Sequence, residues 1–258
     1  MSDPILKVSG VNKSFGPVQV LHDIDFSVYA GEVTALVGDN GAGKSTLIKC
    51  IAGIYAVDSG EILWQGKPVK INSPGAASAL GIEFVYQDLA LADNRDITQN
   101  MFLGREIRWG PFALDGQMER KARETLSGLS VRTVSSVRQV VASLSGGQRQ
   151  TVAIAKAVLW NGKVVILDEP TAALGVAQTK QVLDLVRRLA DNGIGVVLVS
   201  HNMNDVMQVA DRIDALYLGR IAAEVLKKDT TTSQVVELIT AGRSGDIGLS
   251  AATAAESA

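Results

Sequence analysis

Three short segments of the chain are apolar almost without interruption. They are "VTALVG" (33–38), "KVVILDE" (163–169) and "GVVLVSH" (195–201). Because a strand covered on both faces of a sheet has no polar side, such runs predict buried strands of a parallel sheet. The segment "DIDFSVY" (23–29) instead alternates apolar and polar residues, which predicts antiparallel strands with one buried face.

Segments with helical spacing follow two of the buried runs. The first run leads through a glycine-rich turn into "KSTLIKCIAGI" (44–54), and the third leads into "HNMNDVMQVADR" (201–212). Between residues 88 and 160 the pattern is mainly helical, as in "MERKARETLSGL" and "GGQRQTVAIAKAVLW". We therefore expect one α/β domain over 1–242, with a mixed-sheet core and an antiparallel part in 1–87 and 161–242, and a helical subdomain in 88–160.

The last segment, 243–258, is small, polar and weakly periodic. It carries too little apolar area to offset the entropy of ordering, so we expect a disordered tail. At the other end, "MSDPILKVSG" is acidic and lacks the apolar core of a signal peptide, and no window reaches the length of a membrane helix. These features predict a soluble, cytoplasmic protein whose membrane role, if any, comes through a partner.

Composition narrows the possible partners. The net charge is -2, from 25 basic and 27 acidic residues spread along the chain, which argues against a nucleic-acid partner. With one cysteine, Cys50 in "LIKCIAGI", the chain cannot form an internal disulfide, which favours a reducing compartment. Hydrophobic residues make up 47% of the chain, enough for a sizeable core.

The turn between the first buried run and its helix has the order G-x-x-x-x-G-K-S. Its glycines let successive backbone N–H groups face inward, and the following helix adds its positive end, so phosphate oxygens fit there. Lys44 is expected to reach the β and γ phosphates, and the Ser45 hydroxyl to hold Mg²⁺. The expected nucleotide-binding residues are Gly38, Asp39, Asn40, Gly41, Ala42, Gly43, Lys44, Ser45 and Thr46.

Two adjacent carboxylates end the second buried run. Charge next to an apolar strand is costly, so a function explains Asp168 and Glu169 better than a solvated turn at Asp-Glu-Pro does. We expect Asp168 to hold the magnesium through water and Glu169 to polarise the water that attacks the γ-phosphorus.

The segment "LSGGQRQ" (144–150) predicts a second helix N-terminus that could bind an anion. Ser145, Gly146, Gly147 and Gln148 open a helix that keeps one apolar face, so we expect these four residues to contact a nucleotide as well. One copy of each motif is present, which argues against a tandem fusion.

With these three motifs in this order, the chain resembles the ATP-binding subunits of ABC transporters over roughly residues 5 to 240. The resemblance implies a P-loop NTPase cassette that uses ATP and Mg²⁺. It also implies that Phe15 in "NKSFG" stacks on adenine, that Gln87 in "FVYQD" contacts the magnesium or the attacking water, and that His201 contacts the γ-phosphate. Phe15 as a core aromatic and His201 as a structural residue remain the alternatives.

One position departs from the family's common pattern, because Gly175 follows "DEPTAAL" where an aspartate is usual. This glycine, together with "VYQDLALADNRDITQNMFLGRE", is similar to single-domain ATPase subunits of bacterial monosaccharide importers of the ribose and fructose type. The resemblance implies a dimer that sandwiches ATP, separate permease subunits, and a periplasmic sugar-binding protein that acts indirectly. The subunit would then lie on the cytoplasmic face of the inner membrane.

Two other functions remain open. The first is an ABC exporter subunit, and the second is an ABC-type ATPase acting on DNA or ribosomes. The latter proteins carry long coiled-coil insertions or paired cassettes with basic arms, and this sequence contains neither.

Overall fold

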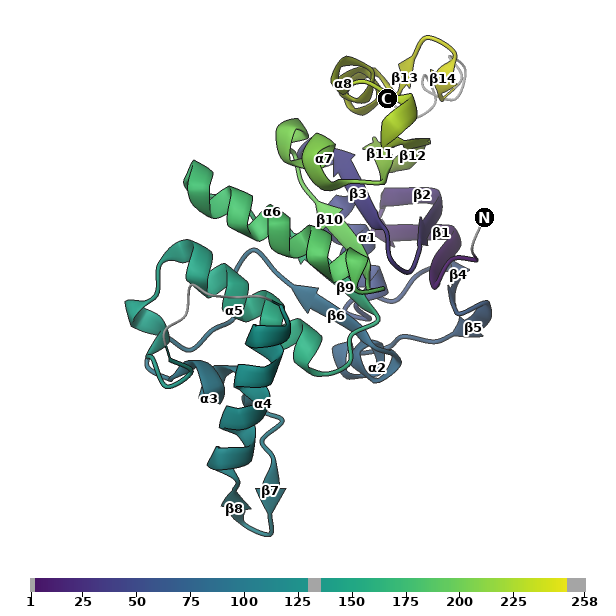
Figure 1. The fold of residues 1–258 in the computed structure, drawn as a ribbon. Coiled ribbons are helices and arrows are strands. Elements are labelled where there is room, and N and C mark those ends of the chain that lie inside the picture. The colour runs from purple at the N-terminus through teal and green to yellow at the C-terminus, as the bar shows by residue number, and fades with distance from the viewer. Residues whose placement is uncertain (1–2, 130–135, 250–258) are drawn as a thin grey trace.

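The computed structural model describes residues 3–129 and 136–249. Its centre is a six-stranded sheet with the strand order β12-β11-β3-β10-β9-β6 (Figure 1). These strands are β3 (Val33–Gly38), β6 (Ile82–Val85), β9 (Val164–Asp168), β10 (Gly195–Val199), β11 (Arg212–Tyr217) and β12 (Arg220–Leu226). Neighbours are parallel except β11 and β12, which are antiparallel. The expected α/β fold with a mixed sheet is confirmed.

A second sheet has four antiparallel strands in the order β2-β1-β4-β5. Its strands are β1 (Leu6–Phe15), β2 (Val18–Val28), β4 (Ser59–Trp64) and β5 (Lys67–Val69). In β2 the residues Ile24, Phe26 and Val28 are buried, and Asp25 between them is exposed. The alternating pattern therefore does mark a strand with one covered face.

Each face of the six-stranded sheet packs into its own apolar core. On one face, Val164 and Ile166 of β9 share a core with α1 (Lys44–Ile51) and the antiparallel sheet. On the other face, Val165 and Leu167 share a core with α5 (Gly146–Leu159) and α6 (Val176–Asp191). Burial on both faces is the reason that this strand is apolar at successive positions.

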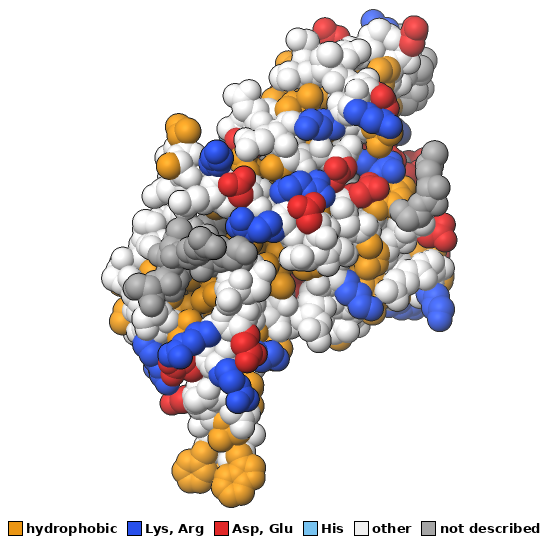
Figure 2. Space-filling model, viewed as in Figure 1, with side chains coloured by type: hydrophobic (Ala, Val, Ile, Leu, Met, Phe, Trp, Pro, Cys, Tyr) orange, Lys and Arg blue, Asp and Glu red, His pale blue; other side chains and the backbone are white. Residues whose placement is uncertain are grey.

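The chain between Gln87 and Trp160 forms a lobe of mainly helical structure, which shares an apolar core with the six-stranded sheet (Figure 1). It contains α3 (Ile97–Phe102), α4 (Asp115–Gly128), a 3₁₀ turn (Val141–Ser143) and α5. It also contains a hairpin that the sequence pattern does not predict, formed by β7 (Arg108–Trp109) and β8 (Phe112–Ala113). Trp109 and Phe112 are 76% and 66% exposed, and apolar side chains gather at this end of the molecule (Figure 2).

The C-terminal part differs from expectation. After α7 (Met203–Val209) and α8 (Thr232–Ala241), the residues expected to begin a disordered tail form the hairpin β13 (Arg243–Ser244) and β14 (Ile247–Gly248). Ile247 and Leu249 pack against the core under α8, and the Ser244 hydroxyl donates to Glu237. These contacts hold 243–249 beside α8, whereas 250–258 lie outside the described residues.

The remaining helix, α2 (Pro74–Leu80), covers the edge near β6. Among the helices of the described ranges, none has the length and apolar character needed to cross a membrane.

Candidate active site

The sequence motifs meet at one edge of the six-stranded sheet because the strands that carry them are parallel. Val199 of β10 pairs with Leu36 of β3 on one side and with Asp168 of β9 on the other. Val85 of β6 pairs with Leu167 of β9. The carboxyl ends of β3, β6, β9 and β10 therefore lie together, where α/β sheets commonly bind ligands.

The turn after β3 packs so closely at two positions that glycine is required there. A Cβ on Gly38 would lie 2.5 Å from the carbonyl oxygen of Leu216, and one on Gly43 would lie 2.9 Å from the Leu21 side chain. Gly43 also has a φ of 110°, a left-handed conformation that favours glycine, and it precedes the first residue of α1. The turn consequently presents the N-terminus of an eight-residue helix to the sheet edge.

Lys44 lies across this turn. Its Nζ donates to the carbonyl oxygens of Gly38 and Asp39, at 2.7 and 3.0 Å. Burial lowers the pKa of Lys44, and the nearby carboxylates of Glu169, Asp39 and Asp168 oppose that shift. The ammonium group is thus held beside the cavity by backbone oxygens and has acidic groups close by.

A cavity of about 400 Å³ opens at this edge. It is lined by Val20, Asn40, Gly41, Gly43, Lys44, Ser45, Thr46, Gln87, Asp168, Glu169, Ala172 and His201. The structure therefore brings the turn after β3 together with four of the residues expected to act on the phosphate, the metal or the water.

The two carboxylates at the end of β9 differ in their surroundings. Burial raises the pKa of Asp168, the adjacent Glu169 raises it further, and Lys44 and Lys49 lower it. Glu169 follows the strand with a φ of 50°, unusual for a residue with a side chain. Its backbone N–H donates to the carbonyl of Val199 at 3.0 Å, which fixes this turn against β10.

Glu169 and His201 form a direct contact. The His201 Nδ1 lies 2.7 Å from the Glu169 Oε1, and the imidazole is 69% exposed whereas the carboxylate is 16% exposed. An exposed imidazole thus contacts a largely covered carboxylate in the lining of the cavity.

Asp205 is a supporting residue that the motifs do not reveal. It lies on α7, is 6% exposed, and accepts a hydrogen bond of 2.6 Å from the Thr171 hydroxyl. Thr171 belongs to the same turn as Glu169, so Asp205 holds that turn from the far side. The only sequence signal is an aspartate one helical turn after His201, which has no meaning without the fold.

Eight of the expected site residues do not line this cavity. Three of them, Gly38, Asp39 and Ala42, belong to the glycine-rich segment 38–46 itself, and the other five lie elsewhere. Phe15 lies at the end of β1, is 42% exposed, and meets the ring of Tyr55 edge-on with centroids 5.0 Å apart. The residues Ser145, Gly146, Gly147 and Gln148 open α5 in the helical lobe.

The start of α5 has a capping box. The Ser145 hydroxyl accepts from the Gln148 N–H, and the Gln148 side chain accepts from the Ser145 N–H at 2.8 Å. Gly146 and Gly147 allow the turn to pack against α6, since a Cβ on either would lie 3.2 Å from Leu174 or 3.0 Å from Gln178. Ser145 and Gly146 are exposed, so this helix start faces outward.

The donor set of the cavity fits a nucleotide phosphate with a magnesium ion. Helix N–H groups and Lys44 suit phosphate, and Ser45, Gln87 and Asp168 offer oxygen ligands in the lining of the same cavity. Within 3–129 and 136–249, no group of three or more His, Cys, Asp or Glu residues could hold a metal. A magnesium ion here would therefore rely on few protein ligands, on water and on the phosphates.

Comparison with known proteins agrees with this site. The family model described as "ABC transporter" matches residues 21–172. The chain is 46% identical over 248 residues to the fructose import ATP-binding protein FrcA of Rhizobium meliloti, covering 93% of this chain and 95% of that protein. It is 43% identical over 249 residues to the xylose/arabinose import ATP-binding protein XylG of Sulfolobus acidocaldarius, covering 96% and 98%.

Longer relatives and solved structures give the same result. The chain is 42% identical to the ribose import ATP-binding protein RbsA 1 of Rubrobacter xylanophilus, of which it covers 48%. A nucleotide-free ATP-binding cassette from an ABC transporter superposes with a TM-score of 0.80 at 26% identity, covering 91% of this chain and 98% of that one. For cbiO1 from Clostridium perfringens the TM-score is 0.76 at 28% identity, with coverages of 88% and 90%.

The fold and the cavity together define a P-loop nucleotide-binding protein that hydrolyses ATP. More specifically, the chain belongs to the ABC transporter family, and it is an ATP-binding ATPase of that family.

Proposed function

We propose that this chain is the ATP-hydrolysing subunit of an importer for a monosaccharide, working with separate permease subunits. The observation that carries the proposal is its relationship over nearly the full length to two proteins named for sugar import, one for fructose and one for xylose and arabinose. The cavity and the outward-facing helix start of α5 supply the physical parts that such a subunit needs.

In the proposed hydrolysis, the residues of the cavity divide the work. Lys44 would bind the β and γ phosphates, and Ser45, Asp168 and Gln87 would hold Mg²⁺, which would neutralise charge on the phosphates. Glu169 accepts a proton from the attacking water. His201 orients the Glu169 carboxylate through their 2.7 Å contact and approaches the γ-phosphate.

The start of α5 serves the nucleotide of a second copy. Ser145 and Gly146 are exposed and lie outside the cavity lining, which supports a role at the nucleotide of another copy. Two copies placed head to tail would each offer this turn to the other's cavity, and each site would then be completed by its partner. We propose this arrangement for the working dimer.

Phe15 can still stack on adenine in that dimer. Its exposed ring lies on the β1–β2 hairpin, whose residue Val20 lines the cavity. The adenine would extend from the phosphate turn along this hairpin.

A groove in the helical lobe offers a docking surface for the permease. It lies where β6 passes into this lobe, has a volume of about 300 Å³, and its lining includes Phe84, Leu89, Leu103 and Trp160. Of the apolar residues that follow Gln87, Leu103 is 50% exposed and lines this groove, whereas Ile97, Met101 and Phe102 are fully buried. A partner helix would contact Leu89 and Leu103, and the other three pack the lobe.

This assignment places the subunit on the cytoplasmic face of the membrane, with the sugar-binding protein on the opposite face and no nucleic acid involved. The test is sugar uptake in a bacterial strain that lacks this subunit. Re-expression of the chain should restore uptake of one of the labelled sugars D-fructose, D-xylose or D-ribose, and Leu103→Glu should abolish both uptake and co-purification with the permease.

The variant Val236→Glu is the matched control. Val236 is a 40% exposed apolar residue on α8, outside the groove, so this change should leave uptake intact. Binding to ribosomes or DNA without a permease, or efflux in place of uptake, would overturn the proposal.

A further inference from the structure

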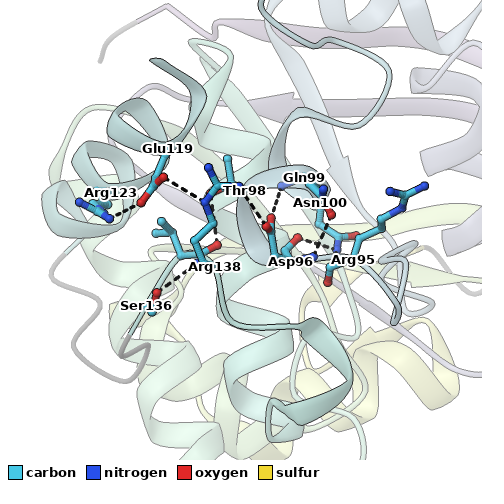
Figure 3. A network of polar contacts seen from close by, with 10 residues as sticks. Arg95, Asp96, Thr98, Gln99, Asn100, Glu119, Arg123, Ser136 and Arg138 are labelled. Carbon is cyan, nitrogen blue, oxygen red and sulfur yellow. Dashed lines mark hydrogen bonds and ion pairs between the residues drawn. The ribbon is translucent and has the colours of Figure 1, made fainter. Parts of the chain in front are cut away.

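A fully buried asparagine holds the loop that follows Gln87. Asn100 on α3 has no exposed surface, and its Oδ1 accepts from the N–H of Ala92 at 2.7 Å. Its Nδ2 donates to the carbonyl oxygens of Arg95 and Asp96, at 3.3 and 3.0 Å (Figure 3). It also donates to the carbonyl oxygen of Ala92 at 3.0 Å. A buried polar side chain that binds four backbone groups fixes the loop far more firmly than an exposed contact would.

The same loop is bonded to the segment that leads into residues 145–148 at the start of α5, which we call the signature turn. The N–H groups of Ala142 and Val141 donate to the carbonyls of Asp93 and Arg95, both at 3.0 Å. Next to these hydrogen bonds, Asp96 and Val140 form an isolated antiparallel β-bridge. The loop 92–96 and the segment 137–142 are therefore joined by backbone hydrogen bonds.

Arg149 extends this connection to α5. Its guanidinium lies 3.1 Å from the Asp93 carboxylate and donates to the carbonyls of Leu144 and Ala142, at 3.3 and 3.2 Å. The residues on either side of Ser145 are consequently tied back to the loop that Asn100 holds.

An outer layer of ion pairs covers the same junction. The Arg138 guanidinium lies 3.0 Å from Glu119 of α4 and 3.5 Å from Asp96 (Figure 3). Its side chain is 44% exposed, so these pairs contribute little compared with the buried asparagine.

From this chain of contacts we propose that Asn100 is a positioning residue for ATP hydrolysis. It fixes the loop 92–96, and through it the signature turn, so that the loop after Gln87 and the start of α5 move as one body. The expected contribution of Asn100 to the rate of ATP hydrolysis rests on the proposed function, in which the signature turn completes the site of a second copy. The structural link itself does not depend on that function.

Two substitutions test the link. Asn100→Ala removes all four side-chain hydrogen bonds, and Asn100→Ser keeps a hydroxyl that can still bond to the carbonyl four residues earlier, which helps the chain to fold. Leu126→Ala is the matched control, because Leu126 of α4 is 4% exposed in the same apolar core but has no place in the loop contacts.

Hydrogen exchange reports the link without any activity. In Asn100→Ala the N–H groups of Val141 and Ala142 should exchange faster than in wild type, relative to those of α4, and in Leu126→Ala that preference should be absent. Unchanged exchange at Val141 and Ala142 in both Asn100 variants would overturn the proposal.

Kinetics then separate positioning from general destabilisation. Asn100→Ala should lower kcat for basal ATP hydrolysis by on the order of tenfold to a hundredfold, because a small displacement of a site residue has effects of this size. The affinity of the isolated chain for ATP should remain, since Asn100 is remote from the cavity lining. Equal losses of kcat in Leu126→Ala and Asn100→Ala, at matched losses of stability, would contradict the positioning role. If the wild-type chain fails to restore sugar uptake, that result counts against the proposed function. It does not count against the link between Asn100 and the signature turn.

Discussion

Among the single residues of the cavity, Lys44 and Glu169 are expected to do different work. Lys44 is held by the backbone carbonyls of the phosphate turn, whereas Glu169 contacts His201. Glu169→Gln should therefore retain ATP binding and lower the rate of hydrolysis by about 10²–10⁴-fold, as expected for loss of a general base. Lys44→Ala should lose binding as well.

Fluorescent-nucleotide titration and phosphate release would measure the two effects separately. Lys163→Ala is the control, because Lys163 is exposed and precedes the first residue of β9, whereas the cavity lies at the other end of that strand. Equal nucleotide affinity in wild type and Lys44→Ala would rule out the assignment of Lys44.

Asp214 gives the chain a pH-dependent weakness. It lies on β11, is 1% exposed, and its Oδ2 has no hydrogen-bond partner within the described structure. Burial raises the pKa of Asp214 well above its usual value, and the nearby Glu224 adds to this. The folded state thus keeps the proton at a pH where the unfolded state has released it.

The sign of the effect follows from this difference. Stability from a raised pKa is present below the unfolded pKa of about 3.9 and is lost as the pH rises towards the folded pKa, at about 1.4 kcal/mol per unit of difference. Asp214→Asn lacks the titrating group, so its advantage in unfolding free energy over wild type should be small near pH 4 and grow towards pH 7. Urea unfolding across this range would measure it.

Asp184→Asn, which removes an exposed carboxyl group of α6, controls for the lost negative charge. An advantage of Asp214→Asn that is constant with pH would contradict the explanation.

Sequence predicts a residue of this site well when the residue follows a recognisable strand in a short motif. Gln87, Asp168 and His201 each follow an apolar run, and parallel pairing brings the ends of those runs together. Asp205 and Asn100 could not be predicted in this way, because their partners are a side chain or backbone groups that only the folded loops place nearby.

At the scale of elements, prediction succeeded where burial repeats over a whole segment. The strands β3, β9 and β10 are buried along their length, so almost every position reports the same environment. The hairpins β7–β8 and β13–β14 have strands of two residues, which are too short to carry a period. Their positions depend on neighbours, as the packing of Ile247 and Leu249 under α8 shows.

The start of α6 offers a test of the unusual Gly175. This residue precedes α6 with an ordinary φ of -72°, has no side chain to cap the helix, and has no atom within 4 Å of where a Cβ would lie. Gly175→Asp should therefore fit without strain and accept a hydrogen bond from the first turn. The cap and its charge at the positive helix end should raise the unfolding free energy by about 0.3–1 kcal/mol.

Urea unfolding of Gly175→Asp would be compared with that of Gly175→Ala, which adds a Cβ without an acceptor. If both variants gain equally, the gain comes from reduced freedom of the unfolded chain and not from capping.

Over the whole molecule, the cavity and the signature turn lie on different lobes. The sequence predicts both as phosphate-ready helix starts, but it cannot say whether one chain joins them into a single site. The structure separates them, because Ser145 and Gly146 are exposed in the helical lobe and do not line the cavity. The order of strands in the six-stranded sheet could also not be predicted from the sequence. β6 and β9 are neighbours in the sheet, although the whole helical lobe lies between them in the chain.

This separation leads to a prediction about assembly. If the turn of one copy completes the cavity of another, ATP lies between the copies and should hold them together until it is hydrolysed. Glu169→Gln, which should bind ATP without cleaving it, is expected to have the mass of a dimer in light scattering with saturating ATP and magnesium, and of a monomer without nucleotide.

Adding Lys44→Ala to this variant removes nucleotide binding and should leave a monomer in both conditions. Saturating nucleotide is needed because Gly175 contributes no carboxylate at the start of α6, which lies next to the signature turn. A monomer of Glu169→Gln at saturating ATP would mean that the exposed signature turn serves another partner. A dimer that persists in the Lys44→Ala background would mean that contacts other than nucleotide hold the copies together.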